Sequence, residues 1–108
     1  TIAVDSRFSE FGAYQQRMIE AISRQWNLLG SQYDLNTAVN TMVVIEYSLD
    51  KSGNLVSISV LYSNSTNTGR GLCEQSILTT APYGEWTREM ISVLGDSNQD
   101  VRITFHYR

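Results

Sequence analysis

Cys73 and His106 are the two residues whose chemistry could support catalysis, because a thiol and an imidazole can act as nucleophile and base. The pattern does not bring them together. Cys73 falls on the apolar face of a predicted helix, where a buried and unreactive thiol is the common case. His106 falls on the polar face of the last predicted strand, beside Thr104 and Arg108. We therefore expect no catalytic pair.

The metal, cofactor and phosphate signatures are also missing from the sequence. A single histidine rules out a two-histidine metal pair, and a single cysteine rules out an intrachain disulfide. Asp96 and Asp100 enclose a polar turn that lacks the spacing of a calcium loop. Glu85 and Glu89 are four residues apart, so on one helix they would repel each other. We expect no enzyme, no metal and no cofactor.

Length and composition predict one globular domain over residues 1–108. Hydrophobic residues make up 42% of the chain and charged residues 18%, which is typical of a protein with its own core. The net charge is −3 and the eight basic residues are scattered, which argues against a nucleic-acid partner. No apolar run is long enough to insert into a membrane. The chain begins with Thr1, and we expect it to be either a processed product or a domain cut from a longer protein.

A long helix is predicted first. Apolar residues recur at steps of three and four along residues 11–29, and Gly30 follows as a C-terminal cap. The helix is expected to start between Ser6 and Glu10. Trp26 lies in its apolar stripe, so we expect Trp26 to be buried between this helix and a sheet.

Three strands are predicted after that helix. Residues 42–49 are apolar and β-branched, a Gly53 turn follows, and residues 55–62 alternate, which together predict a β-hairpin. The last strand, residues 101–107, alternates strictly between apolar and polar side chains. The strand 42–49 is the most apolar and is expected to lie in the middle of the sheet.

Two further helices are predicted between the hairpin and the last strand. One covers residues 72–81 and ends at Pro82, after a loop from 63 to 71. The other is short, begins after Thr87 as its cap and ends at Leu94, with three residues inward: Met90, Ile91 and Leu94. Trp86, in the loop between them, is either a core residue or an exposed contact residue, and burial is the common state of tryptophan.

The fold class expected from this order is α+β. Three antiparallel strands cannot close a barrel, so they form one sheet whose apolar face is covered by the helices in a two-layer αββααβ domain.

Four segments together resemble a known family. They are the opening helix with Tyr14, Ile22 and Trp26; the hairpin 44–56; the helix ending in Thr80-Ala81-Pro82; and the alternating strand 101–107. In this order they resemble the C-terminal domain of the TonB/TolA energy-transducer superfamily. The resemblance implies a periplasmic domain of an inner-membrane-anchored protein that engages an outer-membrane or periplasmic partner.

The last strand is the predicted binding site, because an edge strand offers unpaired backbone groups to an extended peptide. The candidate residues are Val101, Arg102, Ile103, Thr104, Phe105, His106 and Tyr107, with Trp86 as a secondary contact. Arg102 and Arg108 would favour an acidic partner segment. The sheet edges also allow two copies to pair as a homodimer.

Two alternatives stay open at this point. The first is a free-standing periplasmic or secreted adaptor or inhibitor, which a missing upstream membrane anchor would distinguish from a transducer. The second is a small enzyme that uses Cys73, which the accessibility of its thiol would test.

Overall fold

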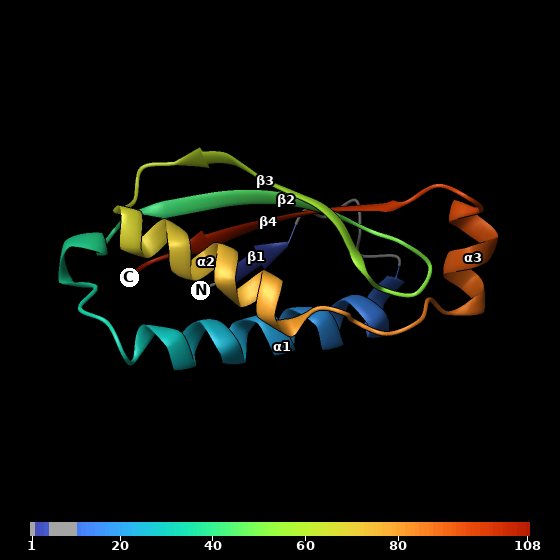
Figure 1. The fold of residues 1–108 in the computed structure, drawn as a ribbon, viewed down its shortest axis with the longest axis horizontal. Coiled ribbons are helices and arrows are strands. Elements are labelled where there is room, and N and C mark those ends of the chain that lie inside the picture. The colour runs from blue at the N-terminus through green and yellow to red at the C-terminus, as the bar shows by residue number, and fades with distance from the viewer. Residues whose placement is uncertain (1, 5–10) are drawn as a thin grey trace.

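The computed structural model describes residues 2–4 and 11–108. Its elements, in chain order, are β1 (Ile2–Val4), α1 (Gly12–Gly30), the 3-10 helix η2 (Asn36–Ala38), β2 (Met42–Leu49), β3 (Leu55–Ser63), α2 (Asn67–Thr80), α3 (Arg88–Leu94) and β4 (Gln99–His106). The predicted α+β class is confirmed. α1 and α2 lie together under one face of the sheet, and none of the described residues forms a helix on the other face (Figure 1).

Within residues 2–4 and 11–108 the sheet has four antiparallel strands in the order β1-β4-β2-β3, so the prediction of three strands was wrong. The predicted arrangement of the other three is confirmed, because β2 lies between β3 and β4. The extra strand, β1, is only three residues long and pairs with residues 103–105 of β4. A segment this short shows almost no alternation, so nothing local in the sequence marks it as a strand.

The core lies between this sheet and the helices. Alternate residues of β2 are buried at 0–1% exposure, namely Val43, Ile45, Tyr47 and Leu49. On the helix side of the core, α1 buries four residues with the spacing that the apolar stripe predicts: Tyr14, Met18, Ile22 and Trp26. Trp26 is 8% exposed and its ring contacts Phe105 of β4 with 5.2 Å between centroids, so its predicted place between helix and sheet is confirmed.

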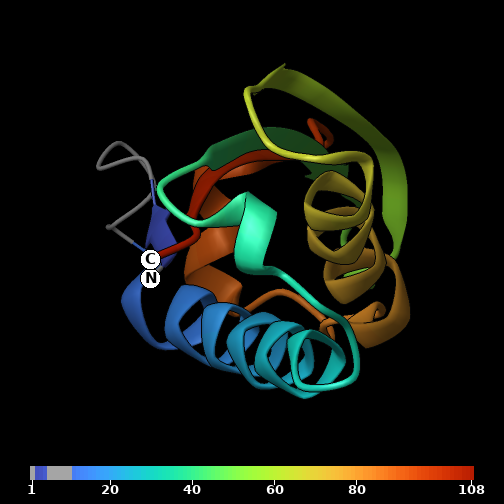
Figure 2. The same cartoon turned by 90° about the vertical axis from the view of Figure 1, so that its left-hand side faces the viewer.

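The ends of α1 differ from the prediction. The helix includes Gly30 and is capped one residue later, at Ser31. Its start was predicted between Ser6 and Glu10, which lies outside the described residues; the described helix begins at Gly12 with Phe11 as its N-cap. Seen from the end of the molecule, α1 and α2 run side by side beneath the curved sheet (Figure 2).

α2 begins five residues earlier than predicted. The hydroxyl of Thr66 accepts a hydrogen bond from the backbone N–H of Gly69 at 3.0 Å and caps the helix there. Gly69 and Gly71 suggested a loop, but both lie inside the helix. Gly69 is needed at its position, because a Cβ would lie 2.3 Å from Oγ of Ser65 and 3.3 Å from the ring of Tyr107.

α3 has the predicted bounds, with the Thr87 hydroxyl accepting from the N–H of Met90 at 3.2 Å and Gly95 at a φ of 60°. Met90 is fully buried. Ile91 is 45% exposed, so its predicted inward position was wrong. Leu94, the third residue predicted to point inward, is partly buried and packs against the core, so α3 contacts the core through Met90 and Leu94. α3 lies at one end of a molecule that measures 44 × 22 × 21 Å (Figure 1).

Candidate partner-binding edge

The strand β4 separates its side chains as the sequence predicts. Val101, Ile103 and Phe105 are fully buried and Tyr107, just beyond the strand, is 7% exposed. The alternate residues Arg102, Thr104 and His106 are half-buried on the face that carries no helix. The predicted site residues therefore form two groups. The apolar residues hold the strand in place, and the polar ones lie where an additional strand could meet them.

The backbone of β4 alternates too, and its direction follows from two hydrogen bonds beyond the strand end. Tyr107 donates its N–H to the carbonyl of Thr41 at 2.9 Å and accepts from the N–H of Asn40 at 2.8 Å, so its backbone groups point toward β2. The β2–β4 pairing runs without a register shift, and in such a ladder consecutive residues point to opposite sides. The N–H and carbonyl of Thr104 therefore point away from β2, toward the outer margin of the sheet.

This outer margin is paired with β1, so the prediction that the last strand lies at the edge of the sheet was wrong. Ala3 of β1 lies directly opposite Thr104, with Ile2 opposite Phe105 and Val4 opposite Ile103. Because the backbone groups of Thr104 face β1, Ala3 and Thr104 form the hydrogen-bonded pair of this short ladder. The predicted margin does accept an extended strand, and in this structure that strand comes from the chain itself.

The end of β4 is held by a buried network around the hydroxyl of Tyr107. It accepts a hydrogen bond from the indole N–H of Trp26 at 3.1 Å and donates to the carbonyl of Gly69. The sulfur of Cys73 lies 3.4 Å from the same hydroxyl. One side chain thus joins the last strand to both α1 and α2.

Cys73 is fully buried in this network. Burial raises the pKa of its thiol to about 12, so at neutral pH it stays protonated and is a poor nucleophile. His106 lies on the opposite face of the sheet by the alternation of β4. The structure therefore does not bring the two candidate catalytic residues together.

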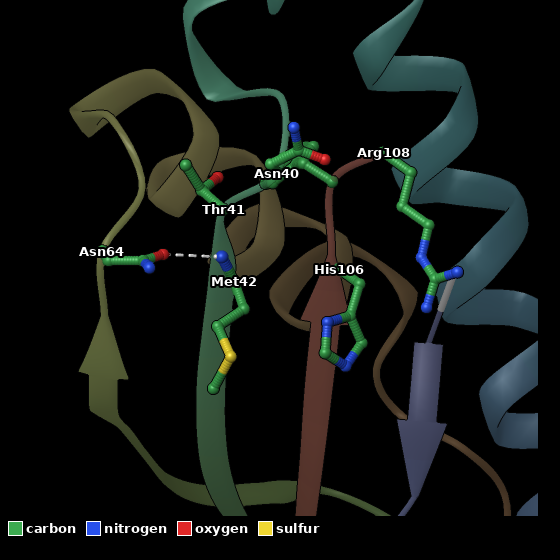
Figure 3. A pocket seen from close by; sticks show the side chains of 7 residues that line it. Asn40, Thr41, Met42, Asn64, His106 and Arg108 are labelled. Carbon is green, nitrogen blue, oxygen red and sulfur yellow. Dashed lines mark hydrogen bonds between the residues drawn. The ribbon is translucent and has the colours of Figure 1, made fainter.

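A pocket of about 360 Å³ lies where β2 and β4 meet the segment after β3. Its lining includes Met42, Asn64, His106 and Arg108. Figure 3 shows these side chains in a row across the sheet, with Asn64 bound to the backbone N–H of Met42 at 2.7 Å and the Arg108 guanidinium at the β1 side of β4. The pocket thus runs across the end of the sheet, and Arg108 is the lining residue that reaches the outer margin of β4.

The two arginines of the predicted site differ in their electrostatic surroundings. Arg102 already binds Glu46 across the strands at 3.0 Å. Within residues 2–4 and 11–108, no carboxylate forms an ion pair with Arg108. A partner carboxylate would have to compete with Glu46 at Arg102, whereas Arg108 presents its charge directly.

Trp86 is 5% exposed, so its side chain belongs to the core and offers no contact surface in this structure. Its loop is held by the hydrogen bond from the N–H of Trp86 to the carbonyl of Lys51 at 2.9 Å. A second margin, on β3, was not among the predicted site residues. In the described part of the chain nothing pairs with the outer side of β3, which carries no charged residue and exposes Val56, Leu61 and Tyr62. The absence of charge from residues 55–63 was the available signal.

Nowhere in the described residues do three His, Cys, Asp or Glu side chains gather as a metal ion would require. None of the described helices combines the length and apolar character needed to cross a membrane.

The fold is similar to that of the C-terminal domain of TonB from Helicobacter pylori, whose structure was determined in solution by NMR. The alignment covers 94% of this chain and 91% of that chain, with a TM-score of 0.61 and 14% sequence identity. No protein-family model matches the sequence, and no curated protein matches it either. The resemblance to a TonB C-terminal domain that the order of elements predicts is thus confirmed for the fold.

Proposed function

We propose that this chain is the periplasmic protein-binding domain of an energy transducer, and that it engages an extended segment of an outer-membrane or periplasmic partner by adding that segment to its sheet along residues 101–107. The observation that carries the proposal is the pairing of β1 with β4, because it demonstrates an extended strand on this margin. The transducing role and the periplasmic location rest on the likeness to the TonB domain.

Strand addition suits a domain of this kind. Backbone hydrogen bonds supply much of the affinity and little sequence preference, so one margin serves segments of differing sequence. Ordering a flexible segment offsets part of the gain, so the affinity is modest and the complex is short-lived. Reversible binding is what a domain needs if it repeatedly grasps and releases a partner.

The positive charge near the end of β4 favours partner segments that carry an acidic residue. Arg108 lies beside the margin at the end of β4, and the Arg102–Glu46 pair lies farther along the same strand. An acidic side chain in the partner segment, placed just beyond Tyr107, would meet the Arg108 guanidinium. The preference is electrostatic and exposed, so it weakens as salt concentration rises.

A proline scan of the two margins tests strand addition. Thr104→Pro removes a backbone N–H that points outward and leaves the β2–β4 ladder intact, so the variant should fold. Peptides selected from a random library on the wild-type domain should bind this variant at least about tenfold more weakly, as expected when backbone pairing in mid-strand is lost.

The matched control is Val60→Pro on β3. Glu46 of β2 lies opposite Arg102 of β4 on one side and Ser59 of β3 on the other. Because the backbone groups of Arg102 point away from β2, Glu46 exchanges its backbone hydrogen bonds with Ser59. The backbone groups of the next residue, Val60, therefore point away from β2. This variant should bind the selected peptides as the wild type does. If Val60→Pro loses binding and Thr104→Pro keeps it, the site lies on β3.

The role as a transducer needs a separate observation. In the full-length gene, a single membrane-spanning segment upstream of this domain, followed by a long linker, is expected. A secretion signal without such an anchor would favour the free-standing adaptor or inhibitor.

A further inference from the structure

The described part of β1 makes few interactions with the rest of the sheet. Within residues 2–4, Ala3 is the residue that can exchange hydrogen bonds with Thr104, and it is exposed to solvent. Ile2 is half-buried and packs at the margin of the core. Among the side chains of β1 whose burial is described, this bonded pair and the half-buried Ile2 are a small attachment compared with that of β2, which pairs with a strand on each side.

β4 can bind a longer strand than β1. By the same alternation that directs Thr104 outward, the backbone groups of Asp100 and Arg102 also point to the outer margin. An extended segment of seven residues would form bonded pairs at all three positions. It would therefore exceed the pairing that the described part of β1 makes.

We propose that β1 occupies the partner site and that the partner segment replaces it in the same antiparallel direction. The segment carries β-branched apolar residues at alternate positions, opposite Phe105 and Ile103 where β1 has Ile2 and Val4, and a small or polar residue opposite Thr104, where β1 has Ala3. This inference rests on the proposed function and names the kind of segment that the site takes.

The replacement makes β1 an internal competitor. Because β1 is part of the same chain as its site, its effective concentration at that site is high. The apparent affinity for a separate peptide is the affinity of the open site multiplied by the fraction of molecules in which the site is open. Short or poorly matched peptides are thereby excluded. Only a segment that pairs over more of β4 than β1 does gains enough to displace it.

The competition can be measured with a synthetic probe peptide, TIAVTVSV, which contains the Ile-Ala-Val sequence of β1 and continues its alternation. Ala3→Pro removes the N–H that faces Thr104 and so empties the margin without altering the core. Fluorescence anisotropy with labelled probe should show at least about tenfold tighter binding to this variant than to the wild type, because more molecules are open.

A disulfide between Ala3→Cys and Thr104→Cys gives the opposite test. A hydrogen-bonded antiparallel pair has its Cα atoms about 5.5 Å apart, which a disulfide can span, and buried Cys73 stays out of the reaction. The oxidised protein should lose probe binding, and reduction should restore it. The single Ala3→Cys variant, treated with the same oxidant, controls for the oxidation itself.

The outcomes separate this inference from the proposed function. Binding that needs a released β1 supports the inference. Equal binding to the oxidised tether and to the wild type overturns it and leaves strand addition at another margin, with β3 as the place to look. No binding to any form, Ala3→Pro included, overturns both the inference and strand addition.

Discussion

Tyr107 connects the last strand to both long helices through one hydroxyl. Trp26 donates to this hydroxyl, and the hydroxyl donates to the carbonyl of Gly69, so the partners lie 81 and 38 residues away along the chain. Buried polar groups that lose a partner keep their full desolvation cost. The end of β4 therefore depends on a residue whose own side chain points into the core.

Tyr107→Phe tests this network. The change leaves the Trp26 N–H and the Gly69 carbonyl without their partner, and should lower the free energy of unfolding by about 1–3 kcal/mol. Urea denaturation measures the loss. Tyr62→Phe is the matched control, because Tyr62 is 50% exposed, and it should change stability by less than about 0.5 kcal/mol. If the two variants lose the same stability, the hydrogen bonds of the Tyr107 hydroxyl do not stabilise the fold.

The turn between β2 and β3 is packed against the segment that leads to α3. The N–H of Tyr83 donates to the carbonyl of Gly53 at 3.0 Å, and the hydroxyl of Tyr14 donates to the carbonyl of Gly84 at 2.7 Å. Gly53 has a φ of 78°, and a Cβ there would lie 2.2 Å from the Gly84 carbonyl oxygen. The hairpin, α1 and the segment before α3 thus meet at a position that only glycine fits.

Gly53→Ala should therefore destabilise the protein by well over about 1 kcal/mol, because it adds strain at a positive φ and a clash with backbone. Gly71→Ala in α2 is the control. Nothing lies within 4 Å of its Cβ position, and alanine favours a helix over glycine by up to about 1 kcal/mol. The thermal midpoint should fall for the first variant and rise or hold for the second. A Gly53→Ala protein of wild-type midpoint would contradict the packing.

At the scale of the molecule, burial raises the pKa of several weakly acidic groups among the described residues, and the Cys73 thiol and the Tyr83 phenol are two of them. Desolvation is the main cause that raises the pKa of Cys73 to about 12 and that of Tyr83 to about 12. In an unfolded chain the thiol ionises near pH 8.5 and the phenol near pH 10, each at about its ordinary value. Above those values the unfolded state releases protons that the folded state retains, so ionisation favours unfolding.

The contribution of these two groups to the free energy of unfolding should hence be constant below about pH 8.5, and the free energy of unfolding should fall as pH rises from there toward about 12. Denaturation curves at a series of alkaline pH values measure the decline. Cys73→Ala removes one of the two groups and should make the decline shallower, whatever its effect at neutral pH. A wild-type stability that stays flat through this range would show that the thiol and the phenol ionise as readily in the folded state.

The sequence by itself determined the elements whose signals are local. The 3.6-residue spacing from Phe11 to Leu29 predicts α1, strict alternation predicts β4, and the Thr87 and Gly95 caps predict α3, because each pattern lies within one segment. The order of these elements was also enough to indicate the TonB-like fold, which the structural comparison supports. The inward residues of β4 follow from alternation alone.

Only the tertiary structure decided what covers the margin of β4 and which margin is open. β1 has too few residues for a periodic signal, and its pairing depends on residues about a hundred positions away. The start of α2 was hidden because Gly69 and Gly71 favour a loop locally, while the packing of Tyr107 against Gly69 requires a close approach inside a helix. Contacts between distant segments outweigh local propensity at these places, because they bury polar and apolar groups that no single segment can bury alone.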